Sequence, residues 1–270
     1  MSHYNENFYE ELWQGSLRSA EIVLPKLLEA LPPIRSAVDI GCGAGAWLSV
    51  LMQCGIEDVR GYDGPWVRPD MLKIPRERFV EMRLDQGFTP DKKYDLALSL
   101  EVAEHLPRES AEWFVAALAR ASDILLFSAA IPFQGGTNHL NEQWPDYWIS
   151  LFAKQGFVVM DFLRKKLWNE TGVEFWYRQN LLLFVQREMV EKIPGNDSAD
   201  HFHGLSLVHP ELYLRKNQPS PSDVLRMPLR QFWKIGIRRT MKWVLGERIC
   251  HFLSKCFRKK KPTFKKWLER

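Results

Sequence analysis

The sequence predicts an α/β fold built around a largely parallel β-sheet. Between about residue 37 and residue 160, short apolar runs typical of buried strands alternate with segments of helical periodicity. This alternation indicates βαβ units, in which a helix returns the chain to the start of the next parallel strand. The first apolar run leads directly into a glycine cluster, residues 41–45, which a helical segment follows. These observations predict one sheet with helices on both faces.

Each apolar run is interpreted as one strand, and each periodic segment as one helix. The predicted strands are 37–40, 59–62, 79–84, 94–100, 124–128, 157–163 and 180–185, and the predicted helices of this part are 47–54, 111–121 and 144–155. An earlier helix has Ser16 as its expected N-cap and contains Pro25, which either kinks it or divides it in two. The segment 164–179 shows no helical period, so a hairpin is predicted between the last two strands.

The chain divides into four parts by composition and pattern. We expect an N-terminal helical cap over 1–34, the α/β core over 35–187, an irregular connection over 188–228 and a basic amphipathic tail over 229–270. Residues 226–270 contain 15 Lys and Arg but only two acidic residues, a formal charge of +13. Since the whole chain carries +4, this leaves −9 for the residues before them.

The basic tail predicts contact with an anionic partner, although a solvated tail would have the same composition. Its apolar residues between Met241 and Cys256 recur at helical spacing, which favours a membrane surface. The N-terminus has no signal-peptide pattern, and no apolar run is long enough to span a bilayer. We therefore expect a cytoplasmic protein with peripheral contact at the inner face of the membrane.

The glycine cluster after the first strand is the first candidate binding site. Glycines allow a tight turn and close approach of a ligand to the backbone. The spacing of Gly41 and Gly43 also fits a dinucleotide fingerprint, with Asp63 near the place of its ribose-binding acid. However, acids near three successive strand ends, Asp39, Asp63 and Asp85, suit a cationic amino group, a ribose diol and an adenine amine. They suit a pyrophosphate poorly.

The order of these motifs resembles that of class I S-adenosylmethionine-dependent methyltransferases. The motifs are residues 38–45, 61–63, 84–85 and 94–107. The resemblance covers residues 35–187 and implies a Rossmann-like sheet of seven strands in the order 3-2-1-4-5-7-6, with the last strand antiparallel. It also implies S-adenosylmethionine as the cofactor.

The same resemblance implies a role for each residue of the cofactor site. Gly41 and Gly43 would line the methionine portion, and Asp39 would assist its amino group. Asp63 would hold the ribose hydroxyls, and Asp85 would accept a hydrogen bond from the adenine amine.

A second candidate site begins at the end of the fourth strand with Glu101, Glu104 and His105. If these residues open a helix, they share one face, and His139 in the loop after the fifth strand would lie opposite them. Two carboxylates and two imidazoles suit a divalent metal such as Mg, Mn, Fe or Zn. The set is similar to the pattern of small-RNA 2′-O-methyltransferases, in which a metal grips a vicinal diol. Without a metal, His139 or His105 would serve as general base.

The loop over 132–148 combines polar residues with Trp144, Tyr147 and Trp148, which suits a sugar or a heterocycle. Trp144 and Trp148 are also spaced as the core face of a helix. The run resembles that of bacterial methyltransferases encoded with surface-polysaccharide genes. We expect O-methylation of a sugar hydroxyl in a glycan or glycolipid. The alternatives are 2′-O-methylation of an RNA ribose and a non-catalytic binding protein with the same fold.

Overall fold

The computed structural model describes residues 6–193 and 205–217 of the chain. The basic tail over 229–270 lies outside these residues, so its predicted membrane contact stays a prediction. None of the helices in the described part of the chain combines the length and the apolar character that a bilayer span needs.

Seven strands form one sheet in the order β3-β2-β1-β4-β5-β7-β6. The strands are β1 (Ser36–Ile40), β2 (Asp58–Asp63), β3 (Phe79–Glu81), β4 (Leu96–Leu100), β5 (Ile124–Ser128), β6 (Phe157–Met160) and β7 (Leu182–Gln186). The first five strands pair in parallel, while β7 runs antiparallel to β5 and to β6. The predicted fold class and strand order are confirmed.

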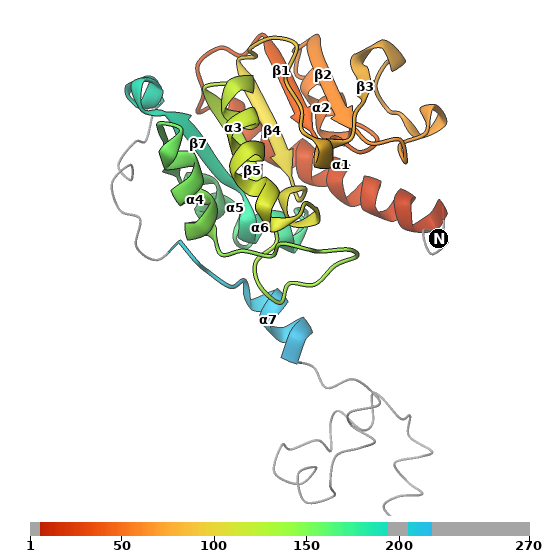
Figure 1. Cartoon of the computed structure of the whole chain (residues 1–270). Helices are drawn as coiled ribbons and strands as arrows, with labels where there is room; N and C mark the ends of the chain where they lie inside the picture. The colour runs from red at the N-terminus through yellow and green to blue at the C-terminus, as the bar shows by residue number, and fades with distance from the viewer. Residues whose placement is uncertain (1–5, 194–204, 218–270) are drawn as a thin grey trace, which may run out of the picture. The chain divides into compact units, whose positions relative to one another are not determined.

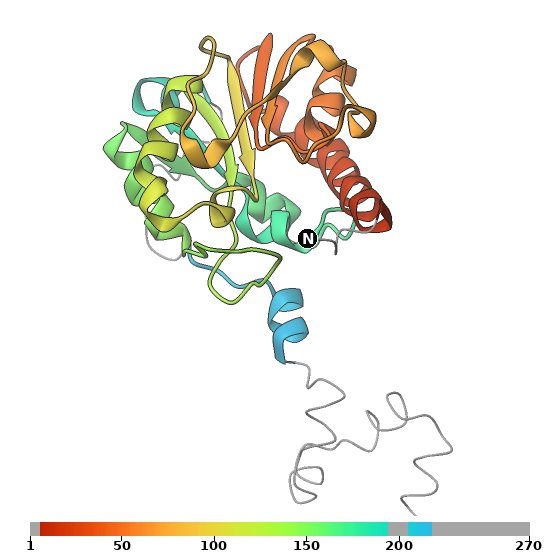
Figure 2. The same ribbon diagram turned by 45° about the vertical axis from the view of Figure 1, so that its right-hand side comes forward.

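Helices cover both faces of the sheet (Figures 1 and 2). One face packs against α1 (Glu6–Leu28), α2 (Ala46–Gln53) and α5 (Phe162–Leu167), and the other against α3 (Ala111–Ala121) and α4 (Pro145–Lys154). In β1, Ala37 faces the first helix layer, whereas Val38 and Ile40 face the second. Because both faces are buried, strands such as β4, β5 and β6 are apolar along almost their whole length rather than alternating.

The connection between β6 and β7 is not the simple hairpin that the sequence predicts. It contains α5 and a further short helix, α6 (Phe175–Asn180). Each has six residues, which is less than two turns and too short to show a period. Both also bury polar side chains, Arg164 in α5 and Gln179 in α6, which hide the apolar pattern.

Other elements also differ from their predictions. α1 begins at Glu6 and continues through Pro25, so Ser16 lies inside the helix, where its hydroxyl is 3.1 Å from that of Tyr177, and is not an N-cap. β3 ends at Glu81 and β6 ends at Met160, each three residues earlier than predicted, because the chain enters the turn after β3 and the helix α5 after β6. The described part of 188–228 is not wholly irregular, because it contains α7 (Pro210–Asn217). Pro210 supplies the preorganised first residue of that helix.

Candidate active site

The glycine turn after β1 has the backbone geometry that a ligand cradle needs. Gly41 and Gly43 have φ angles of +89° and +53°, which glycine adopts without strain. A Cβ on Gly41 would lie 2.2 Å from the Val102 side chain, so only glycine fits there. A Cβ on Gly43 would meet nothing within 4 Å, which leaves one side of the turn open.

Asp63 ties the end of β2 to this turn. Its carboxylate accepts a hydrogen bond from the Gly43 amide at 2.6 Å and another from the Gly64 amide at 2.7 Å. Burial raises its pKa in spite of these hydrogen bonds. The predicted ribose-binding acid therefore lies beside the predicted methionine-binding turn.

Asp39 is a buried carboxylate that needs a positive partner. Its side chain is 2% exposed, and its Oδ1 accepts no hydrogen bond from any described residue. Burial, and next the charge of Asp63, hold the pKa of Asp39 well above its ordinary value. A cationic amino group at this place would compensate the buried charge. The turn and its two acids thus fit the amino end and ribose of S-adenosylmethionine.

Asp85 has a different environment. It lies in a 3-10 turn (Leu84–Gln86) after β3, exposed and ion-paired with Arg83 at 2.7 Å. The Arg83 guanidinium lowers the pKa of Asp85. Asp85 also lines an open groove of about 720 Å³ that includes Phe88 and Trp113. Its predicted contact with the adenine amine stays a prediction.

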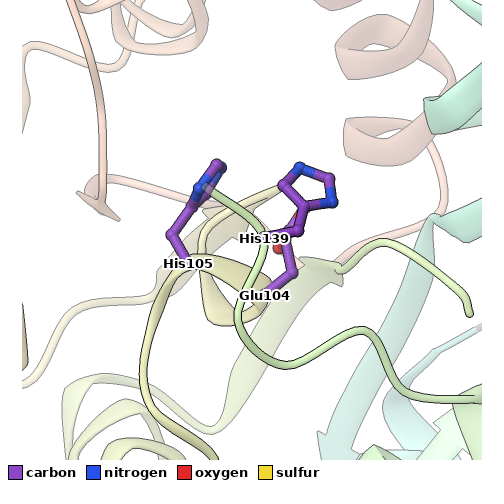
Figure 3. A group of neighbouring side chains, drawn as sticks. All are labelled: Glu104, His105 and His139. Carbon is purple, nitrogen blue, oxygen red and sulfur yellow. The ribbon is translucent and has the colours of Figure 1, made fainter. Parts of the chain in front are cut away.

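Three of the four predicted metal ligands lie together (Figure 3). Glu104 and His105 lie in a 3-10 turn (Ala103–His105) after β4, and His139 lies in the loop after β5. Each offers one ligand atom, and these atoms all lie within 4.8 Å of one another. The turn is not the helix opening that the sequence predicts, but it still brings the two neighbours to His139.

The buried carboxylate of Glu104 lacks a compensating positive charge in the part of the chain that the structure describes. Both of its carboxylate oxygens are buried, and within the described chain neither has a partner in hydrogen-bonding geometry. Burial, and next the charge of Glu101, hold the pKa of Glu104 well above its ordinary value. The nearby amides of Glu104 and Ala130 act in the opposite direction but do not cancel these effects. A divalent cation would supply the missing charge.

The two histidine rings lie close together at this place. Their rings lie 4.9 Å apart and nearly perpendicular. Burial, and next the proximity of His139, lower the pKa of His105. Nδ1 of His139 lies 2.9 Å from Oε1 of Glu142, the carboxylate–histidine pairing that orients metal-binding imidazoles. A Cβ on Gly136 would come within 2.2 Å of Nε2 of His139, so glycine allows this close approach.

Glu101 lies outside the group of three. Its carboxylate oxygens accept hydrogen bonds from the amides of Gln134 and Asn180, each at 3.0 Å. Its backbone has φ of +56°, and its amide donates to Ser128 at the end of β5. Burial raises its pKa, while these amide donors lower it. Glu101 is therefore not among the three residues whose ligand atoms lie together.

Sequence reasoning missed the residues that support this site. Gln134 also accepts hydrogen bonds from the amides of Gln179 and Asn180, so the loop after β5 is bonded to the end of α6. The sequence contains one indication of the role of Glu142, which is its position three residues after His139. It contains no indication of the role of Gln179, because the segment 164–179 is interpreted as part of a hairpin. Of the three loop aromatics, Trp148 is core, whereas Trp144 is 40% exposed.

Comparison with known families identifies the fold and its chemistry. Residues 17–160, more than half of the chain, match the family model described as a methyltransferase domain. The chain belongs to this family. Class I members use S-adenosylmethionine, which agrees with the glycine turn and the acids beside it. A comparison of this chain with curated proteins found no match.

Several solved structures are similar to this methyltransferase at low sequence identity. A sugar N-methyltransferase from Streptoalloteichus is 17% identical, with 69% of this chain and 97% of that chain covered and a TM-score of 0.51. Magnesium protoporphyrin IX methyltransferase from Synechocystis is 22% identical, with 68% and 86% covered and a TM-score of 0.48. A methyltransferase from Archaeoglobus fulgidus is also 22% identical, with 58% and 76% covered and a TM-score of 0.46.

Replacing Asp63 by Ala is expected to weaken S-adenosylmethionine binding to the methyltransferase. Loss of hydrogen bonds to a buried diol costs about 1–3 kcal/mol, which corresponds to roughly a 5- to 150-fold rise in Kd. Calorimetric titration checks the change, with thermal melting to confirm folding. Asp70→Ala, which removes an exposed partner of Arg68, is the control. Equal affinity in Asp63→Ala and the wild type would remove Asp63 from the site.

Proposed function

We propose that the methyltransferase methylates a sugar hydroxyl of a glycan or glycolipid, with a vicinal diol of the acceptor held at a divalent metal. The observation that carries this proposal is the buried Glu104 carboxylate, whose oxygens have no partner in hydrogen-bonding geometry among the described residues and which lies beside His105 and His139. A pair of neighbouring hydroxyls is the simplest acceptor that such a metal holds, and sugars provide it.

The bound cofactor and metal would supply one part of the chemistry, and the side chains of the protein would supply the other. When bound, S-adenosylmethionine supplies the methyl group on its sulfonium, and a divalent ion increases the acidity of an adjacent hydroxyl. Glu104 would supply a carboxylate oxygen to the ion, and His105 and His139 would each supply an imidazole nitrogen. Glu142 fixes the orientation of the His139 ring through Nδ1. The rest of the protein aligns the acceptor with the methyl group.

The two candidate sites adjoin one another. β1 and β4 are neighbouring parallel strands, so the turn after β1 and the turn after β4 leave the same edge of the sheet. Val102, between Glu101 and Glu104, packs against Gly41 of the cofactor turn. A methyl donor on the glycine turn would therefore face an acceptor at the group of three.

The loop after β5 supports a sugar as the acceptor. Phe133 and Trp144 are 86% and 40% exposed, and both belong to the loop that carries His139. Exposed aromatic rings pack well against the apolar faces of sugar rings. An RNA ribose also offers a vicinal diol, and it is therefore the alternative acceptor that the experiments must separate.

Chelation tests the metal directly. Treatment with an excess of EDTA is expected to abolish methyl transfer while leaving S-adenosylmethionine binding unchanged, because Asp39 and Asp63 lie outside the metal group. Adding back Mg, Mn, Fe(II) or Zn in separate reactions identifies the ion. Transfer that survives exhaustive chelation would exclude a catalytic metal, and His139 or His105 as general base would then be the mechanism to test.

The acceptor is tested with a labelled methyl group. Purified protein is incubated with methyl-tritiated S-adenosylmethionine and either a glycolipid extract, free glycans or RNA oligonucleotides. Label in a sugar hydroxyl, located by mass spectrometry, supports the proposal. Label in RNA alone would replace it with ribose methylation. Label in none of the acceptors, together with no S-adenosylmethionine binding, would favour a non-catalytic binding protein.

A further inference from the structure

Large exposed apolar side chains concentrate on one part of the molecule. Eight such side chains occur among the described residues, and seven of them belong to two segments, 133–144 and 207–214. These seven are Phe133, Leu140, Trp144, Leu207, Val208, Tyr213 and Leu214. We call them the apolar rim. The eighth, Trp66, follows β2. Soluble surfaces scatter such residues singly, so their concentration on two segments indicates an interaction surface.

The two segments lie side by side in the fold. Ile131 and Leu212 share one buried cluster, and the Ser206 hydroxyl is 3.2 Å from a carboxylate oxygen of Asp146. A Cβ on Gly135 would lie 2.6 Å from Nζ of Lys216. Both ribbon views show α7 beside the loop after β5, next to the sheet edge that carries the candidate site (Figures 1 and 2). The apolar rim is therefore one region built from distant parts of the sequence.

The apolar rim is physically joined to the candidate metal group. The carboxylate of Glu142 accepts hydrogen bonds from the amides of Phe133 and Gly135, each at 2.7 Å, and also pairs with His139. The amide of Leu140 donates to the carbonyl of Glu104 at 2.7 Å. Whatever contacts the rim is thus positioned directly beside the site.

We propose that the apolar rim docks the methyltransferase on an anionic lipid bilayer, which presents a lipid-linked sugar to the candidate site. The identity of the acceptor rests on the proposed function, but the docking does not. Phe, Trp, Tyr and Leu together are typical of surfaces that insert into the bilayer interface. Phe133 is 86% exposed, the most exposed of these side chains, and has φ of +67° in its loop.

Charge favours a bilayer over a protein partner. Lys216 and Arg215 are exposed on α7 directly after Tyr213 and Leu214, although Arg215 also pairs with Glu211. The sequence beyond α7 is strongly basic, with a formal charge of +13 over residues 226–270. Apolar side chains flanked by Lys and Arg are attracted both to the acyl region and to the anionic headgroups of a bilayer.

Vesicle sedimentation of the full chain tests the docking. The vesicles contain phosphatidylglycerol and phosphatidylcholine in equal amounts, without acceptor, cofactor or metal, so the outcome does not depend on methyl transfer. The variant is the pair Phe133→Ser and Leu214→Ser, and the matched control is Trp66→Ser, which removes an exposed apolar side chain elsewhere. The paired variant is expected to bind roughly tenfold more weakly or worse, whereas the control should bind like the wild type.

High salt separates the rim from the basic tail, because salt screens charge attraction and leaves apolar insertion intact. The wild type should retain residual binding at high salt that the paired variant lacks. Thermal melting confirms that each variant is folded. Equal binding of the wild type and the paired variant in both salts would overturn the proposal. So would an absence of vesicle binding with self-association of the wild type that the paired variant loses, since the rim would then be a protein interface.

Discussion

Replacing Glu104 by Gln is expected to abolish metal-dependent methyl transfer and, at the same time, to stabilise the metal-free protein. The carboxylate is buried with neither oxygen hydrogen-bonded among the described residues, so its charge costs folding free energy until a cation arrives. An amide of the same shape removes that charge. We expect a gain of about 1–3 kcal/mol in the free energy of unfolding at neutral pH. Metal affinity should fall by roughly 100-fold or more.

The contribution of Glu104 to the free energy of unfolding depends on pH. Because the folded protein holds the pKa of Glu104 well above its ordinary value of 4.5, the folded state keeps a proton that the unfolded state has lost. The contribution of Glu104 to stability is therefore full below pH 4.5 and falls as the pH rises toward the raised pKa. Asp39, whose pKa is also raised, acts in the same direction. Glu104→Gln should flatten this decline, and a divalent ion should offset it in the wild type.

Urea unfolding with and without metal, at several pH values, measures both effects together with transfer assays. Glu112→Gln is a matched control, because that glutamate is exposed and pairs only with Lys154 among the contacts described. If Glu104→Gln is less stable than the wild type without metal, the nearby Glu101 carboxyl and Ala130 amide stabilise the Glu104 carboxyl more than its burial destabilises it. If the variant still transfers methyl groups at the normal rate, Glu104 does not belong to the reaction.

Replacing Asp161 by Ala is expected to cost about 3–5 kcal/mol of stability, because it leaves a buried guanidinium without its charge partner. Arg164 is 1% exposed and pairs with Asp161, with Nε 2.7 Å from Oδ1. Its Nη1 donates to the carbonyls of Gln179 and Leu205, at 3.1 and 2.8 Å. This one side chain therefore joins α5, α6 and the segment that leads to α7.

Thermal and urea unfolding check this prediction. Asp70→Ala, which breaks the exposed Arg68–Asp70 pair, should change stability very little, since exposed ion pairs contribute little. Equal stability of Asp161→Ala and Asp70→Ala would mean that Arg164 finds other compensation. Because Arg164 also holds Leu205, we further expect faster proteolysis of the 205–217 segment in Asp161→Ala.

The cofactor half of the site is predictable from sequence because its chemistry is local. Gly41 and Gly43 stand two positions apart in the chain, and glycine is the residue type that adopts their positive φ angles without strain. Asp39 and Asp63 adjoin the ends of strands that apolar runs mark clearly. In parallel strands these ends share one edge, so the sequence places the acids near the turn without knowledge of any contact.

The acceptor half depends on contacts between distant segments. The approach of His139 to Glu104 across 35 positions follows from the pairing of β4 with β5, which the sequence predicts as a fold but not as a distance. Glu101 looks like a ligand in the sequence. The structure instead bonds it to Gln134 and Asn180, which come from the loop after β5 and from the end of α6.

The sequence by itself determined the α/β class, the strand order through the resemblance, and the glycine turn with its acids. These features depend on periodicity and on neighbours in the chain, which a single sequence records. Only the tertiary structure decided which acid is buried without a partner, and that the loop after β5 and α7 form one apolar rim. Burial and charge compensation depend on what packs around a side chain, and among the described residues Glu101 has side-chain amide donors that Glu104 lacks.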